Sequence, residues 1–210
     1  MRHAVNDLKR ERRELDRGTL VLLVRGLWAH PIFEHRLMAV LLLETFKPRL
    51  RPADFRMLER LVRESRTWAL VDELAVTVAG PLVERHPSLL GRLDRWSEDR
   101  DFWVRRSALL TLLRPLRRGD GDFDRFAAYA DSMLEEREFF IRKAIGWVLR
   151  ETSKKRPALV YEWLLPRCDR ASGVTVREAV RWLSPAQRAR CLAAYRRATG
   201  RMVTSVRAPR

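Results

Sequence analysis

Cysteine, glycine and long apolar segments are all scarce in this chain. Its two cysteines, Cys168 and Cys191, cannot form a disulfide framework, so we expect a protein of the reducing cytoplasm. The four histidines show no metal-ligand spacing with the cysteines, and there is no glycine-rich phosphate loop or G-x-S-x-G turn. The longest apolar run, 37–43, is far shorter than the about twenty residues of a membrane span. We therefore expect no metal, no nucleotide cofactor and no membrane partner.

Positively charged residues greatly outnumber negatively charged ones in this chain. The 210 residues carry 43 Lys and Arg against 27 Asp and Glu, a formal net charge of +16. With 46% hydrophobic and 33% charged residues, the chain has enough apolar material to fold around a core in water. We expect one domain over 1–200 and a disordered tail over 201–210, where periodicity is lost. Such an excess of positive charge favours a polyanionic partner, and nucleic acid is the first candidate.

Strand patterns are also missing. Alternation of period two never persists, and the short β-branched patches at 174–176 and 203–206 are isolated. Apolar residues instead recur every three or four positions between prolines, which predicts an all-α protein. The expected helices span 19–29, 32–46, 53–64, 67–85, 88–97, 102–117, 123–135, 138–153, 158–168, 174–183 and 185–198.

The helical pattern repeats. Similar segments begin the second helix of successive pairs, with their arginines at Arg36, Arg105, Arg142 and Arg177, and the segment 70–75 fills the remaining slot. A period in the mid-thirties with two helices per unit predicts an α-solenoid of HEAT-like repeats, in which each unit buries its core by stacking on its neighbours. We expect a curved superhelix whose concave, basic face is formed by the same helix of every pair.

This register groups several polar and aromatic residues. Asp72, Arg106 and Lys143 occupy equivalent positions in three successive repeats. Trp68 lies four residues before Asp72, and Trp147 lies four residues after Lys143, so each indole shares a helical face with its polar partner. We expect these side chains to converge on one concave patch.

Three segments carry a family resemblance. They are 67–72 (TWALVD), 102–108 (FWVRRSA) and 138–151 (EFFIRKAIGWVLRE), and they resemble the AlkD-like DNA glycosylases over about residues 25–183. The resemblance implies a HEAT-like enzyme that removes 3-methyladenine and 7-methylguanine from duplex DNA while the lesion stays stacked, contrary to the usual extrusion of a target base.

The resemblance also implies roles for individual residues. Asp72 matches the catalytic carboxylate, Trp68 and Trp147 match aromatic residues that pack on the damaged nucleotide, and Arg106 matches an arginine that holds DNA. A cationic alkylpurine leaves as a neutral base, so no general acid is required, and one carboxylate suffices to stabilise the oxocarbenium and position water. We therefore expect a monofunctional hydrolase of base excision repair. An abasic-site lyase would require an amine nucleophile, and Lys143 is the only lysine near these residues.

Further DNA contacts are expected from basic residues at helix starts and turns. Arg100, Lys143 and Lys154 are the residues that we select for binding phosphates. We expect a monomer in the cytoplasm, associated with the nucleoid when bound to DNA. Relative to the resembled family, the first helices look shortened, and we expect a weaker grip on DNA as a result.

Other interpretations of the same residues remain open. Trp68 and Trp147 would be core residues if the helices stacked on them, and Asp72 would be an ordinary salt-bridged helix residue. The other tryptophans are expected to be structural; these are Trp28, Trp96, Trp103, Trp163 and Trp182. The first alternative function is a non-catalytic protein that binds branched or distorted DNA, and a more distant one is a scaffold for an acidic protein.

Overall fold

The computed structural model describes residues 2–11, 15–200 and 202, and helices account for all regular structure in these ranges. The all-α prediction is therefore confirmed, and residues 174–176 lie in a helix rather than a strand. Contacts divide the chain into two compact units, Met1–Trp96 and Ser97–Arg210, each with its own core. Of the predicted tail at 201–210, all but Met202 lies outside the described residues.

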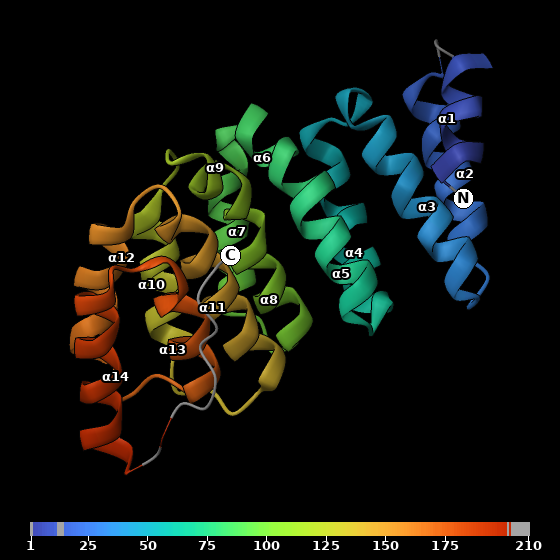
Figure 1. The fold of residues 1–210 in the computed structure, drawn as a ribbon. Helices are drawn as coiled ribbons and strands as arrows, with labels where there is room; N and C mark the ends of the chain where they lie inside the picture. Colours follow the sequence, from blue (N-terminus) through green and yellow to red (C-terminus); the bar gives the residue numbers. More distant parts are fainter. Residues whose placement is uncertain (1, 12–14, 201, 203–210) are drawn as a thin grey trace. The chain divides into compact units, whose positions relative to one another are not determined.

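Unit 1 is a succession of short helices around α3. Its helices are α1 (Arg2–Glu11), α2 (Arg17–Trp28), α3 (Phe33–Thr45), α4 (Phe55–Ser65), α5 (Trp68–Glu73), α6 (Gly80–Arg85) and α7 (Leu90–Ser97). Both α1 and α2 pack on α3, which also contacts α5 (Figure 1). Helix α2 begins where Asp16 accepts a hydrogen bond from the Thr19 N–H at 3.0 Å. Helix α4 ends at Arg66, which takes the left-handed conformation with φ 48°.

The helix predicted over 67–85 is continuous but not uniform. Between α5 and α6, residues Leu74–Ala79 form a π-helical segment, η3, so the rod runs from Trp68 to Arg85. Short 3₁₀ turns at the proline breaks flank α4 and α7; they are η1 (Lys47–Arg49), η2 (Pro52–Asp54) and η4 (Pro87–Leu89). π-Helical segments are rare and frequently accompany functional residues.

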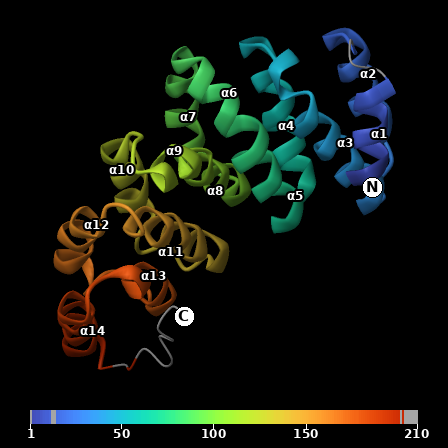
Figure 2. The same cartoon turned by 45° about the horizontal axis from the view of Figure 1, so that its top comes forward.

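Unit 2 is built around α11. Its helices are α8 (Phe102–Thr111), α9 (Leu113–Arg118), α10 (Phe123–Met133), α11 (Phe139–Ser153), α12 (Pro157–Leu164), α13 (Gly173–Ala179) and α14 (Pro185–Thr199), with 3₁₀ turns η5 (Leu165–Arg167) and η6 (Val180–Trp182). Helix α11 lies between α8 and α13 (Figure 2). The approach to α13 is close at Gly146, where a Cβ would stand 2.8 Å from the Glu178 Cβ and 3.2 Å from the Thr175 Cα. Gly146 therefore permits the close packing of α13 on α11.

The predicted period is visible in the side-chain contacts. The Trp28 indole N–H donates to Glu64 at 2.7 Å, and Arg167 makes two bonds to Asp131 at 2.6 and 2.8 Å. Each pair is separated by 36 residues, about one repeat. These bonds tie equivalent parts of neighbouring repeats together.

The aligned arginines also have a structural role. Arg36, Arg105 and Arg142 donate to the backbone carbonyls of Glu64, Asp99 and Glu136, at 2.7, 2.6 and 2.6 Å. Each accepting carbonyl lies at or beyond the end of a first helix, where carbonyls lack partners within the helix. The repeated arginine therefore donates hydrogen bonds to backbone carbonyls that lack partners at the ends of the first helices.

Two sequence expectations need correction. The expected helices begin at residue 19 and omit α1, a helix that docks on α3 and of whose described side chains only Val5 is buried. The expected structural role holds for Trp28, Trp96, Trp103 and Trp163, which are 2–9% exposed, but Trp182 is 40% exposed and is not a core residue. It lies in η6, whose turn leaves its indole at the surface of unit 2.

Candidate functional site

Trp68 and Asp72 lie on the same flank of α5 in unit 1. Helix α5 begins at Trp68, and Asp72 follows one turn later. Between them, Leu70 and Val71 are buried in the core at 1% and 0% exposure, whereas Trp68 is 56% exposed and Asp72 is half-buried. The helix therefore buries one side and presents an indole and a carboxylate on the other.

The next residue, Glu73, has a different environment from Asp72. Arg2 of α1 donates to Glu73 at 2.6 Å and to Glu44 of α3 at 2.8 Å. The hydrogen bonds that Arg2 donates to Glu73 and Glu44 raise the pKa of Arg2 above its ordinary value. Thr77 in η3 donates its hydroxyl to the Glu73 carbonyl at 2.7 Å. Glu73 thus secures α1 to the rod that carries Asp72, and the π-helical segment begins directly after it.

Arg106 is the most buried of the predicted site residues. Only 3% of the residue is exposed, and its guanidinium donates to the Phe140 carbonyl and lies 5.7 Å from the Phe140 ring centroid. Phe140 also packs on Trp103, with ring centroids 4.8 Å apart. A phosphate contact by Arg106 stays a prediction; it would require the side chain to leave these partners.

Lys143 and Trp147 lie one turn apart on α11 in unit 2. Both are half-buried. The Lys143 ammonium donates to Glu178 of α13, which also accepts a hydrogen bond from Arg150. Burial opposes ionisation of Glu178, but the Lys143 hydrogen bond and the charges of Lys143 and Arg150 outweigh it, and the pKa of Glu178 is lowered. Lys143 is therefore held in place by an ionised carboxylate.

Lys154 belongs to a second carboxylate-centred cluster. Glu151, 5% exposed, accepts from Lys154 at 2.8 Å and pairs with Arg117 of α9 at 3.1 Å. Burial raises the pKa of Glu151, but these partners have the larger combined effect and lower it overall. The Lys154 ammonium also lies 5.5 Å from the Trp182 ring centroid, a cation–π distance. The surface here therefore combines a lysine with an exposed indole.

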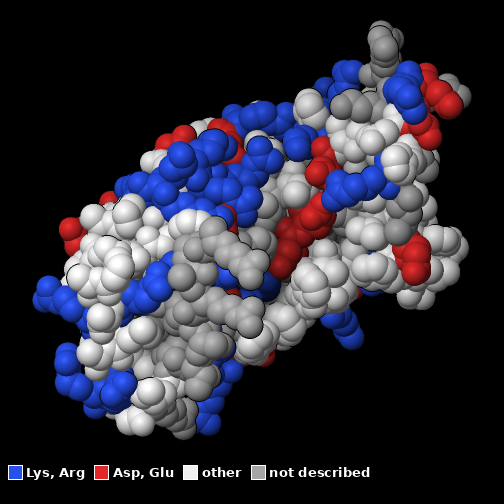
Figure 3. All heavy atoms as spheres, in the orientation of Figure 1, with Lys and Arg blue, Asp and Glu red and all other residues white. Residues whose placement is uncertain are grey.

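Basic side chains gather around this cluster. Figure 3 shows Lys and Arg side chains over α9 and the turn from α11 to α12. We call this surface the α9 basic patch, and it consists of Arg117, Arg118, Lys154, Lys155 and Arg156. Because the patch combines several cations at one surface of unit 2, it fits a polyanion.

The remaining predicted contact, Arg100, is exposed in the turn before α8. Its backbone carbonyl accepts a hydrogen bond from Arg105 at 3.0 Å, which fixes the turn. The predicted residues are thus divided between the units: Trp68 and Asp72 lie together in unit 1, whereas Arg100, Arg106, Lys143, Trp147 and Lys154 lie in unit 2. Trp182 is the residue that the sequence missed, because its spacing from other apolar residues resembles that of a core position.

Within residues 2–11, 15–200 and 202, His, Cys, Asp and Glu nowhere gather in a group of three suited to a metal ion. In the same residues, every helix is too short or too polar to cross a bilayer.

Comparisons with known proteins point in one direction. A family model described as a DNA alkylation repair enzyme matches residues 1–183. Among solved structures, a predicted DNA alkylation repair enzyme from Enterococcus faecalis aligns with a TM-score of 0.78 at 24% identity, over 88% of this chain and 85% of that one. The chain therefore shares its all-α helical-repeat fold with a solved structure. Searches of curated proteins gave no match.

Proposed function

The chain belongs to the DNA alkylation repair enzyme family, and from that membership we propose that it hydrolyses the N-glycosidic bond of cationic alkylpurines in duplex DNA. The substrates are 3-methyladenine and 7-methylguanine, and the lesion is cleaved without being extruded from the stack. In this proposal the protein acts as a monomer in the cytoplasm, associates with the nucleoid when bound to DNA, and needs no cofactor.

One observation supports the proposal most strongly. Trp68 leaves 56% of its surface exposed, one turn from Asp72 on the same flank of α5. Tryptophan side chains are highly buried on average, and an indole left exposed beside a carboxylate offers a flat apolar face on which a nucleotide can pack. The core interpretation of Trp68 does not account for this exposure.

The chemistry requires only what α5 presents. Alkylation puts a positive charge on the purine, so cleavage of its bond to C1′ releases a neutral base and leaves the positive charge on the sugar. Asp72 stabilises that oxocarbenium as it develops and orients the water that attacks C1′; the proton of this water passes to the carboxylate or to solvent. The Trp68 face adds roughly 0.5–2 kcal/mol of cation–π stabilisation.

In this proposal the residues of unit 2 bind the DNA. Trp147 packs on the nucleotide, and Lys143, Lys154 and Arg100 bind phosphates, which fixes register without reading sequence. Arg106 joins them if it exchanges the Phe140 carbonyl for a phosphate. Trp182 beside Lys154 extends the set, because an exposed indole next to a cation suits a sugar–phosphate surface.

Excision and binding must be measured separately. The test incubates the protein with methylated duplex DNA and quantifies the released 7-methylguanine and 3-methyladenine by chromatography, alongside a shift assay on the same duplex and on a four-way junction. Release of either purine supports the proposal. Junction binding without any release would select the alternative of a non-catalytic protein for branched DNA, which the α9 basic patch alone would serve.

A further inference from the structure

A cavity in unit 1 lies apart from the α5 residues. It has a volume of about 270 Å³ and is lined by side chains of α2, η2 and α4, with none from α5. Helices α2 and α4 are the first helices of successive pairs, whereas Trp68 and Asp72 are carried by a second helix. This cavity is therefore a feature that the proposed glycosylase activity does not use.

The cavity is strongly cationic. Four arginines line it against one aspartate, Asp54. Asp54 is 3% exposed and already satisfied: it accepts two hydrogen bonds from Arg17, one at 2.8 Å, and one from the Arg51 N–H at 2.8 Å. The hydrogen bond to Asp54 raises the pKa of Arg17. Asp54 thus neutralises Arg17, and among the residues that the structure describes no other acidic one lines the cavity to balance the charges of the three remaining arginines.

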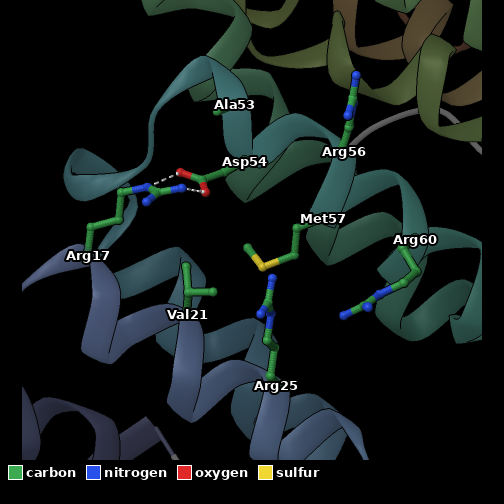
Figure 4. Close-up of a pocket in the computed structure, with 8 residues that line it drawn as sticks. All are labelled: Arg17, Val21, Arg25, Ala53, Asp54, Arg56, Met57 and Arg60. Carbon is green, nitrogen blue, oxygen red and sulfur yellow. Dashed lines mark hydrogen bonds and ion pairs between the residues drawn. The ribbon is translucent and has the colours of Figure 1, made fainter.

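Two of those arginines face the same space. Figure 4 shows Arg25 reaching from α2 and Arg60 from α4 into the space beside Met57, whereas Arg56 points away from it. Within residues 2–11, 15–200 and 202, no acidic side chain pairs with Arg25. Arg60 has only a long pair with Glu64, at 3.8 Å and with both side chains about half exposed, which holds it weakly.

The lining matches one ligand chemistry. Guanidinium groups bind phosphate oxygens through paired N–H donors, and two of them facing one space, opposed in the described residues only by the weak Arg60–Glu64 pair, favour an anion of more than one charge. Val21 and Met57 add apolar side chains to the lining, which suit the carbon skeleton attached to a phosphate.

We propose that Arg25 and Arg60, with Arg17 fixed by Asp54 at the rim, form a binding site for a phosphoryl group. The group belongs either to a nucleic-acid backbone or to a free nucleotide. Because the site is made by the first helices, its occupation is independent of cleavage at Asp72.

The test uses the full chain and two probes: pyrophosphate, titrated by calorimetry at low salt, and an unmodified 16-base-pair duplex, followed by fluorescence anisotropy. Arg25→Gln and Arg60→Gln are the test variants. Arg63→Gln is the matched control, because it removes the same charge from the same helix α4 at a residue that does not line the cavity and pairs with Glu59 at 2.7 Å. We expect each test variant to weaken pyrophosphate binding about tenfold or more, the usual loss of a charged hydrogen bond, and the control to change it less than about twofold.

The duplex separates the two sources. If the group is a backbone phosphate, pyrophosphate competes with the duplex, and each test variant lowers the slope of log K against log salt by about 1. If it is a free nucleotide, duplex binding and its salt slope stay at the wild-type values. The site would be refuted if pyrophosphate did not bind, or if Arg63→Gln lost as much affinity as the test variants. Purine release from methylated DNA, measured in parallel, reports on the proposed glycosylase independently.

Discussion

Lys143 donates to Glu178, the residue at the equivalent position of the next repeat. The repeat register suggested a shared surface for Asp72, Arg106 and Lys143. It also places Lys143 against Glu178, the acidic residue at the same position of the following repeat. Glu178 also accepts a hydrogen bond from Arg150, so one carboxylate holds two cations of α11 against α13.

Glu178→Gln should destabilise unit 2. The substitution leaves Lys143 and Arg150 without their counter-charge, and since both are partly exposed we expect a loss of roughly 1–3 kcal/mol. Chemical denaturation followed by circular dichroism measures it. Glu162→Gln, an exposed position on α12, is the control and should stay within about 0.5 kcal/mol of wild type.

The same carboxylates predict a direction of pH dependence. The pKa values of Glu151 and Glu178 are lowered in the folded protein, so their contribution is complete above the unfolded-state value, about 4.3 for Glu, and is lost as the pH falls through the folded values. Stability should therefore decline below about pH 4.3, and Glu178→Gln should flatten that decline. Equal slopes for wild type and variant would contradict the assignment.

Trp68→Ala should separate activity from stability. Because the indole is largely exposed, we expect a stability change within about 0.5–1 kcal/mol, together with at least about a tenfold loss of purine excision. Trp28→Ala is the structural comparison: that indole is 3% exposed and bonded to Glu64, so its loss should cost about 3–5 kcal/mol. A Trp68→Ala protein with full excision and reduced stability would return Trp68 to a packing role.

The α9 basic patch predicts the salt dependence of DNA binding. Lys154→Gln should lower the slope of log K against log salt by about 1, because one phosphate contact is removed. Arg190→Gln, an exposed cation on α14, changes the net charge equally and should leave the slope unchanged. Anisotropy titrations over a range of NaCl concentrations distinguish the two; identical slopes for both variants would place the contacts elsewhere.

The two thiols should be inert in the folded protein. Cys168 and Cys191 are 1% and 0% exposed, and their mutual hydrogen bond together with burial raises the pKa of Cys168. Alkylation by iodoacetamide should be at least about 100-fold slower than in urea, because reaction requires opening of the structure. Rapid labelling of the native protein would show that the region around η5 and α14 opens freely.

Helix positions could be read from the sequence because prolines and apolar periodicity are local signals. Local signals could not reveal α1, which depends on docking to α3, or the break at Leu112 between α8 and α9. The π-helical segment after Glu73 was equally invisible, since its composition is ordinary for a buried helix.

The candidate site was predictable in part. The spacing of Trp68 and Asp72 places them on one flank of α5, as the sequence indicated, because helical geometry fixes neighbours one turn apart. Exposure depends on tertiary packing, and for that reason the burial of Arg106 and the exposure of Trp182 could not be foreseen. Their roles, like the concave basic face, stay predictions.

The catalytic role of Asp72 is tested most directly by single-turnover release of 7-methylguanine from methylated duplex DNA, with enzyme in excess. Glu73→Gln, which neutralises the adjacent carboxylate on α5, is the control and should excise at nearly the wild-type rate. Asp72→Asn should bind the duplex normally and lose at least about 100-fold in rate, the usual scale for removing one group that stabilises transition-state charge. Undiminished release by Asp72→Asn would contradict the account.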